Sequence, residues 1–186
     1  MRFFKNPVVA VLLSAVIIIA STLVSVKVRF GAKVQEVNDA FLDGMEVNGE
    51  VQKGIAAHLR TINHYAGDLL AMAERYDVNA EDVEEASEWL RLGLQYSADD
   101  ASYVYYEYDE LNKALDSLGN RLSAADISQA DRESMNQIYA NIADEKAQIH
   151  ASGYNDMVRA FYKKYAHFPT DVLASLAGVY MPGYFQ

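Results

Sequence analysis

The feature that most constrains this chain is an uncharged stretch from Val8 to Val26. Twelve of its nineteen residues are Val, Ile or Leu. A helix of this length crosses the hydrocarbon core of a bilayer, which requires about 20 mostly apolar residues. Pro7 suits the first turn of such a helix, where a backbone N–H would have no partner. We therefore expect residues 1–30 to form an N-terminal membrane anchor.

The alternative for the same stretch is a cleaved signal peptide. However, the apolar run exceeds the roughly 7–15 residues of a signal-peptide core, and no small-x-small cleavage site precedes Lys27. These features favour a single-pass anchor in the cell membrane. Basic residues on its two sides nearly balance, and the small excess after the stretch favours a cytoplasmic position for residues 31–186. These basic residues are Arg2 and Lys5 before the stretch, and Lys27, Arg29 and Lys33 after it.

Beyond the apolar stretch, a second pattern continues along the chain in alternating steps of three and four residues. This spacing is typical of the a/d seam of a helix that packs lengthwise against partners. It predicts one helix from Val8 to Tyr76, roughly 100 Å long at about 1.5 Å per residue. The seam positions are Val34, Val37, Phe41, Gly44, Asn48, Val51, Ile55, His58, Ile62, Tyr65, Leu69, Met72 and Tyr76.

Four glycines lie in the first part of this seam region, at Gly31, Gly44, Gly49 and Gly54. Each costs about 1 kcal/mol of helix stability relative to alanine. Two interpretations remain open: the region is a hinge, or Gly44 allows a neighbouring helix to approach closely.

Two more long helices are expected after Tyr76. The second begins with Asn79 as its N-cap and an acidic first turn, and Gly119 with Asn120 ends it. Its apolar stripe, which includes Trp89, weakens near Ser97, where Ser97-x-x-Asp100 would cap a new helix. A break near residue 97 is therefore an alternative.

The third long helix follows a connector with two possible caps, Ser123-x-x-Asp126 and Ser128-x-x-Asp131. It ends before Pro169, because proline forces the preceding residue out of the α region. A short helix then runs from Thr170 to Ala177. The apolar tail from Val179 to Phe185 must pack on another part of the protein.

The predicted fold is all-α, in agreement with only three prolines and ten glycines in 186 residues. A transmembrane helix continues into an elongated antiparallel bundle of three long helices, with a short helix at the C-terminus. A helix broken near residue 97 would make it a four-helix bundle. Residues 31–186 form the single bundle domain in this interpretation.

Charge and composition exclude several functions. The formal charge is −10 and the sequence pI is about 4.8, so nucleic acid, a polyanion, is not an expected partner. The chain has no cysteine, which removes disulfides, thiolate metal ligands and thiol catalysis.

Catalytic and metal-binding patterns are also missing from the sequence. The Glu-x-x-His pattern of di-metal bundles would need glutamate three residues before a histidine. Those positions hold Ile55, Thr61, Ala147 and Lys164. No phosphate-binding glycine loop or nucleophile elbow occurs either. We expect no enzymatic activity, no cofactor and no metal.

Glu145 is the most unusual position, because it lies between Ile142 and Ile149 on the apolar stripe of the third helix. A buried carboxylate needs a cation or hydrogen bonds, and His58, Lys53 and Arg60 of the first helix are the candidate partners. The alternative is a solvated carboxylate at the edge of the stripe. The seam residues His58 and Asn48 are expected to set helix register.

Two groups of tyrosines are further candidates for structural or interaction roles. Tyr103, Tyr105, Tyr106 and Tyr108 point in several directions on a helix, so some must reach the surface or another chain. Tyr154 and Asn155 form either a buried hydrogen-bonded pair that fixes helix register or part of a partner site.

The C-terminal quarter of the chain resembles the signature of the LemA family. The residues that carry the resemblance are Glu145, Ile149, Tyr154-Asn155, Val158, Phe168-Pro169, Ala174 and the closing segment from Gly178 to Phe185. The chain departs from the family at Ala151 and Ser152, near which an arginine is usual, and at Phe161-Tyr162, in place of a second Tyr-Asn pair. The resemblance implies a membrane-anchored helical bundle with a short external amino terminus and the bundle inside.

These observations favour a non-enzymatic scaffold or adaptor for other proteins of a bacterial cell envelope, and its assembly into an oligomer remains open. The second hypothesis is a sensory or ligand-binding bundle, in which the cluster from Tyr103 to Tyr108 lines a pocket.

Overall fold

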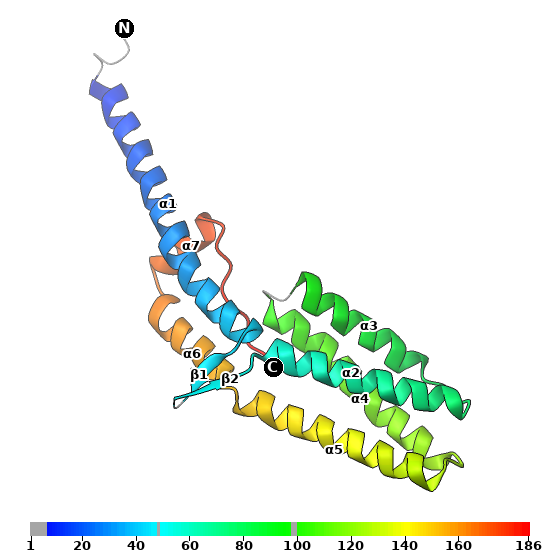
Figure 1. Cartoon of the computed structure of the whole chain (residues 1–186). Helices are drawn as coiled ribbons and strands as arrows, with labels where there is room; N and C mark the ends of the chain where they lie inside the picture. The colour runs from blue at the N-terminus through cyan, green and yellow to red at the C-terminus, as the bar shows by residue number, and fades with distance from the viewer. Residues whose placement is uncertain (1–6, 48, 98–99) are drawn as a thin grey trace. The chain divides into compact units, whose positions relative to one another are not determined.

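The computed structural model describes residues 7–47, 49–97 and 100–186 (Figure 1). The all-α prediction is confirmed, since a two-stranded hairpin is the only sheet within these ranges. Three residues used in the sequence analysis, Arg2, Lys5 and Asn48, lie outside them. The elements are α1 (Pro7–Leu42), β1 (Met45–Val47), β2 (Glu50–Gln52), α2 (Ile55–Arg75), α3 (Glu81–Tyr96), α4 (Ala101–Ala124), α5 (Gln129–Ala151), α6 (Tyr154–Tyr165) and α7 (Thr170–Leu176).

The chain divides into two compact units. The first consists of Met1–Val37 and Arg159–Met181, and the second of Asn38–Val158 and Pro182–Gln186. Each unit therefore combines segments that are far apart in the sequence.

In the first unit, the apolar part of α1 exposes its side chains. Ile17, Ile18 and Val24 are each about 60% exposed, and none of the most apolar 18-residue window is buried. This helix is long and apolar enough to cross a membrane.

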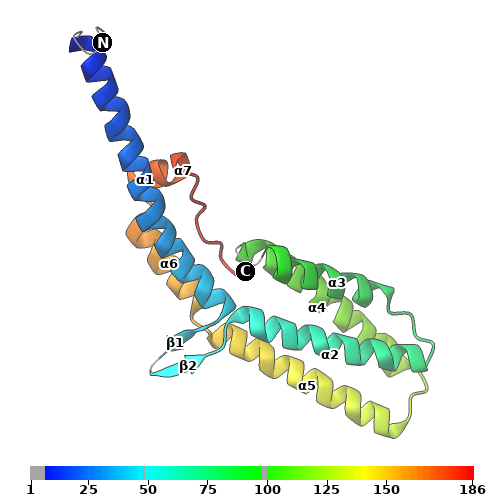
Figure 2. The same ribbon diagram turned by 45° about the horizontal axis from the view of Figure 1, so that its top comes forward.

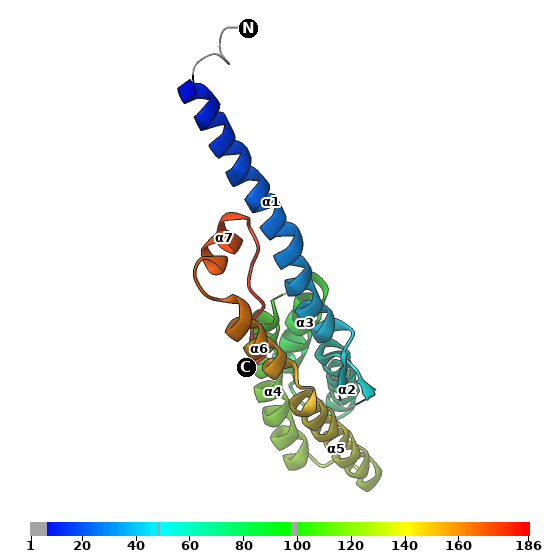
Figure 3. The ribbon, with the colours of Figure 1, turned by 90° about the vertical axis from the view of Figure 1, so that its left-hand side faces the viewer.

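Burial begins where the apolar stretch ends, because the rest of α1 in this unit packs against α6 (Figure 3). Phe30, Val34 and Val37 are 6%, 9% and 2% exposed. The Phe30 ring makes edge contacts with Phe161 and Tyr165, with centroid distances of 5.4 and 5.8 Å. The predicted change from lipid-facing residues to seam residues therefore falls close to residue 30.

In the second unit, α2, α3, α4 and α5 lie side by side as a four-helix bundle (Figure 2). Helix α2 contacts the other three, and α3 packs along α4. Short connections join successive helices, which gives antiparallel neighbours. The innermost side chains include Leu59, Ile62, Leu69, Val83, Leu90, Leu111, Leu115, Leu118 and Leu122, all less than 2% exposed.

The prediction of one helix from Val8 to Tyr76 is wrong. Helix α1 ends at Leu42, and a hairpin follows in which Met45 pairs with Gln52 and Val47 pairs with Glu50. Gly44 and Gly49 have φ angles of +100° and +86°, a left-handed region in which glycine alone is unstrained. The glycine-rich segment therefore interrupts the helix.

The seam prediction holds on both sides of this break. Val37 and Phe41 on α1, and Ile62 and Leu69 on α2, are at most 2% exposed. The pattern is wrong inside the hairpin, where Val51 is 84% exposed. The seam positions continue at spacings of three and four residues through the hairpin, although this segment is not helical.

The second predicted helix breaks at Ser97, so the four-helix alternative is confirmed. Asp100 caps α4 by accepting hydrogen bonds from the backbone N–H groups of Ser102 and Tyr103, both at 3.2 Å. The predicted end at Gly119 is wrong, since α4 continues to Ala124. Gly119 instead leaves room for Tyr139, whose hydroxyl donates to the Leu115 carbonyl at 2.7 Å.

The third predicted helix is also divided, a break that the sequence analysis missed. Helix α5 ends at Ala151, and Gly153 adopts a φ of +71° before α6 begins. The predicted terminal helix is present as α7, and Gly178 follows it with a φ of +69°.

A polar cluster joins the end of α2 to the start of α5, where Ser128, one of the two possible caps, is the N-cap. Asp131 accepts hydrogen bonds from the Tyr76 hydroxyl at 2.5 Å and the Ser128 hydroxyl at 2.7 Å. Its carboxylate also pairs with Arg75 at 2.6 Å. The Tyr76 and Ser128 hydrogen bonds, with a smaller contribution from the Arg75 charge, hold the pKa of Asp131 below its ordinary value.

We expect Asp131→Asn to lower the Tm at pH 7 and to lower it progressively less as the pH falls below about 4. The folded-state pKa of Asp131 lies below the unfolded value of about 4, so its stabilisation is complete above that unfolded value. It is lost as the pH falls through the folded-state pKa. Circular dichroism melts across this pH range measure the difference. The exposed Asp126 in the same connector is the control, and an equal effect of Asp126→Asn would contradict the prediction.

Candidate functional site

The structure brings Glu145 of α5 together with His58 of α2. His58 Nδ1 lies 2.5 Å from Glu145 Oε2, and the two side chains are 11% and 25% exposed. Of the three partners considered for Glu145, His58 is the one in contact. The contact is an ion pair when the imidazole is doubly protonated and a neutral-donor hydrogen bond when only Nδ1 carries a proton.

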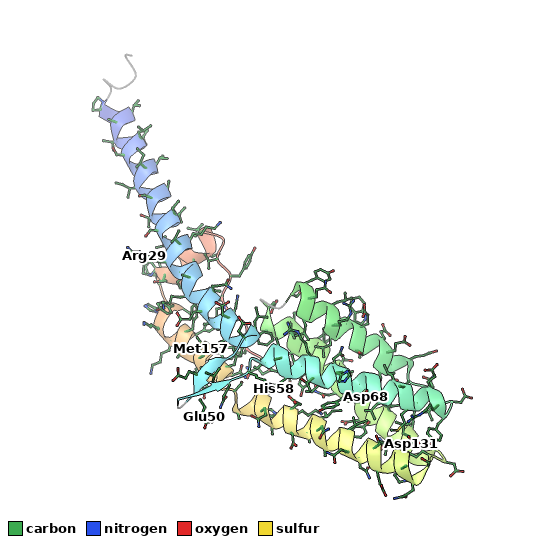
Figure 4. All side chains as sticks on the ribbon, viewed as in Figure 1. Arg29, Glu50, His58, Asp68, Asp131 and Met157 are labelled. Atoms are coloured by element: carbon green, nitrogen blue, oxygen red, sulfur yellow. The ribbon has the colours of Figure 1, made fainter. Side chains whose placement is uncertain are left out.

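This pair is part of the interface between two helices of the bundle. Figure 4 shows His58 near the start of α2 and Asp131 near the start of α5, so the two polar contacts lie toward opposite ends of the α2–α5 pair. Polar contacts at both ends fix the register between the helices, since a shift by one turn would separate both pairs of partners.

A double-mutant cycle with His58→Ala and Glu145→Ala should give a coupling free energy of about 1–2 kcal/mol, because the pair is largely removed from water. Urea unfolding of the four proteins measures it. Arg60 is the matched control, and the Arg60→Ala and Glu145→Ala changes should be additive. Coupling as large with Arg60 as with His58 would contradict the observed pairing.

Tyr154 and Asn155 at the start of α6 hold the C-terminal segment. The Asn155 amide donates to the Phe185 carbonyl and accepts from the Phe185 N–H, both at 2.9 Å. The Tyr154 hydroxyl donates to the Gly183 carbonyl at 2.8 Å, and its side chain is fully buried. The two residues are hydrogen-bonded internally, as one interpretation expected, but they fix the tail and not the register of two helices.

The Phe185 ring completes this attachment from the apolar side. It lies among Phe41, Tyr105 and Tyr108, with ring centroids 5.8, 5.1 and 5.6 Å away. Phe185 is 6% exposed, and burial raises the pKa of Tyr108 above its ordinary value. The end of the apolar tail therefore packs within the second unit. We call Tyr154, Asn155 and Phe185 with its aromatic neighbours the tail clamp.

The tyrosine cluster of α4 divides between two faces. Tyr105 and Tyr108 belong to the tail clamp, whereas Tyr103 and Tyr106 are 39% and 59% exposed. Tyr103 and Tyr106 line a cleft of about 670 Å³ between α3 and α4, together with Trp89. The expectation that these rings point in several directions is correct.

Carboxylates line the same cleft, which we call the α3–α4 cleft. They are Asp82, Glu85, Glu107 and Glu110, and Lys113 is the cation among the lining residues. Glu107 is only 7% exposed. A hydrogen bond from the Tyr103 hydroxyl to Glu107, helped by burial, raises the pKa of Tyr103. The cleft therefore has a fixed, largely buried carboxylate beside aromatic rings.

Trp89 and Glu107 were missed as cleft residues. Trp89 was assigned to the core-facing stripe, but it is 48% exposed. A helical spacing relates Asp82, Glu85 and Trp89 on α3, and a similar one relates Tyr103, Glu107 and Glu110 on α4. Two neighbouring helix faces that mix acids with aromatics were the signal available in the sequence.

Within the described ranges, no three His, Asp or Glu side chains gather in a way that would hold a metal ion. Comparisons of the chain with protein-family models, with curated proteins and with solved structures found no match.

Proposed function

We propose that this chain is a single-pass protein of the cell membrane whose helical bundle acts as a non-enzymatic scaffold or adaptor for other envelope proteins. The exposed apolar part of α1 supports the proposal most directly. Its side chains stay exposed in the folded chain, and a bilayer would remove them from water. Burial that starts at Phe30 is the pattern expected where a lipid-facing helix becomes part of a folded domain.

Membership of the LemA family and a cytoplasmic bundle are part of this proposal. Glu145, Tyr154 and Asn155 of the family signature each have an internal hydrogen-bond partner here, as residues retained for a common architecture would. The three basic residues just after the apolar stretch favour the cytoplasmic side under the positive-inside rule.

The anchor is tested by alkaline carbonate extraction of membranes from cells that express the full chain, followed by mass measurement of the purified protein. An anchored protein stays in the pellet and keeps its first residues. A soluble protein that has lost residues up to about Val26 would establish the signal-peptide alternative.

The scaffold role is tested by crosslinking in intact cells and co-purification from the membrane fraction. We expect defined products with other membrane proteins, or with a second copy of this chain. Recovery of the uncrosslinked monomer alone, at crosslinker doses that capture a known membrane complex in the same cells, would reject the role.

A ligand-binding function is the second candidate, and the α3–α4 cleft favours it. Its volume of about 670 Å³ lies within the roughly 300–1,000 Å³ of small-molecule sites, and aromatic and charged groups converge on it. Titration of the cleft with small organic cations as well as with peptides separates the two functions.

A further inference from the structure

The α3–α4 cleft is long enough for several residues of an extended polypeptide. Its lining residues extend from Asp82 to Trp89 on α3 and from Tyr103 to Ala114 on α4. At about 1.5 Å per helical residue, the α4 side is roughly 16 Å long. An extended chain advances about 3.3 Å per residue, so about five residues fit along it.

The charge of the cleft selects a positively charged occupant. Among the lining residues, four carboxylates outnumber one ammonium group, and one of the four, Asp82, is paired with Arg121 at 2.7 Å. That ammonium, Lys113 Nζ, is held by Asp109 at 2.8 Å and Glu110 at 2.7 Å on its own helix. Glu85 accepts a hydrogen bond from Trp89 Nε1 at 3.4 Å and Glu107 accepts one from the Tyr103 hydroxyl, so both carboxylates lie beside aromatic residues of the cleft, and Glu107 is nine-tenths buried. A cation there would be attracted in a partly desolvated setting, where charge pairs are strongest.

The aromatic rings select the kind of cation. Trp89, Tyr103 and Tyr106 line the same cleft, and cations bind over the faces of such rings. A guanidinium group stacks flat on aromatic rings and also forms paired hydrogen bonds with a carboxylate, whereas an ammonium group is more strongly hydrated. The combination of three rings with Glu107 therefore suits arginine better than lysine.

We propose that the α3–α4 cleft binds an extended segment of a partner protein by inserting an arginine side chain between Trp89, Tyr103 and Tyr106 and against Glu107. This inference rests on the scaffold role proposed above and names the chemistry of the partner.

Trp89 is the only tryptophan of the chain, so its fluorescence reports on the cleft alone. The experiment titrates the full chain in detergent micelles with the peptide Gly-Arg-Gly-Arg-Gly. Matched peptides carry lysine, or the uncharged isostere citrulline, in place of arginine. We expect a saturable change in Trp89 emission, with arginine bound at least tenfold more tightly than citrulline and several-fold more tightly than lysine. Binding should weaken as salt is raised.

Four variants locate the site. Glu107→Gln keeps a partner for Tyr103 but removes the charge, and it should weaken arginine-peptide binding about tenfold. Tyr106→Leu should weaken it about fivefold through the lost ring. Glu84→Gln on α3 and Tyr96→Leu at its end lie outside the lining residues and should leave binding unchanged. Circular dichroism melts establish that each variant is folded.

Two results would overturn the inference. The first is equal binding of the arginine and citrulline peptides. The second is unchanged binding after both Glu107→Gln and Tyr106→Leu in proteins that melt as the parent does. Tetramethylammonium and free arginine amide are further probes, and either one bound as tightly as the peptide would replace the partner segment by a small organic cation.

The outcome is separable from that of the scaffold test. Crosslinked partners without arginine-peptide binding would reject this inference and leave the scaffold role standing. Peptide binding without any crosslinked partner in cells would reject the scaffold role and leave the cleft as a cation site.

Discussion

Phe185→Ala should cost about 3–4 kcal/mol of the free energy of unfolding, one of the largest effects of a single side chain in the second unit. The ring is 6% exposed among Phe41, Tyr105 and Tyr108, and its removal leaves a cavity that three other rings cannot fill without moving. Without the ring to position residue 185, the two hydrogen bonds between its backbone and the Asn155 side chain would also weaken. Urea unfolding followed by circular dichroism measures the loss as a lower midpoint at unchanged slope.

Tyr180→Ala is the matched control, because Tyr180 belongs to the same C-terminal segment but is 88% exposed. It should change the free energy of unfolding by less than about 0.5 kcal/mol. A loss below about 1 kcal/mol for Phe185→Ala would mean that the tail is not held by the clamp in solution. In that case Asn155→Ala should also leave the free energy of unfolding unchanged, which gives a second check on the same conclusion.

Gly44→Ala should be at least as severe, with an expected loss of about 3 kcal/mol or more. A Cβ atom at Gly44 would lie 1.9 Å from the Gln52 carbonyl oxygen and 2.7 Å from the Gly54 nitrogen. Both contacts are with backbone atoms, so a side-chain rotation cannot relieve them. The φ of +100° adds strain for any residue with a Cβ. Urea unfolding measures the loss, and hydrogen exchange of the hairpin amides shows whether the pairing of β1 with β2 survives.

Gly49→Ala separates the two causes. Gly49 has a φ of +86°, but among the described residues beyond its chain neighbours no heavy atom lies within 4 Å of the position that a Cβ atom would take. It should therefore show the conformational cost alone, about 1–2 kcal/mol. If the two substitutions had equal effects, the close approach of the backbone at Gly44 would not limit stability.

Local sequence patterns predicted most of the helices because apolar periodicity reports directly on the buried face of each one. The same method failed at the hairpin, since the spacing of apolar residues does not report the backbone conformation of the residues between them. The better signal was the dipeptide Asn48-Gly49 between short segments that alternate apolar and polar residues, which is typical of a two-residue hairpin loop. Gly153 was a similar missed stop for α5.

The candidate sites were less predictable, because they depend on contacts between distant segments. Glu145 could be singled out from its place on an apolar stripe, and three partners could be named, but only the register of α2 against α5 selects His58. Nothing local to Asn155 indicates Phe185, which lies 30 residues away. Likewise, the α3–α4 cleft depends on which faces of the two helices pack against each other.

The tail clamp fixes the position of the residue before Gln186, and so the point from which any polypeptide fused after Gln186 would extend. The Asn155 side chain hydrogen-bonds both the N–H and the C=O of Phe185. A fusion partner would therefore begin at the surface of the second unit, without a flexible tail of this chain between them. A labelling enzyme or fluorophore placed there would thus sample the immediate neighbourhood of α4 and the start of α6, and the length of its linker would set the radius that it surveys.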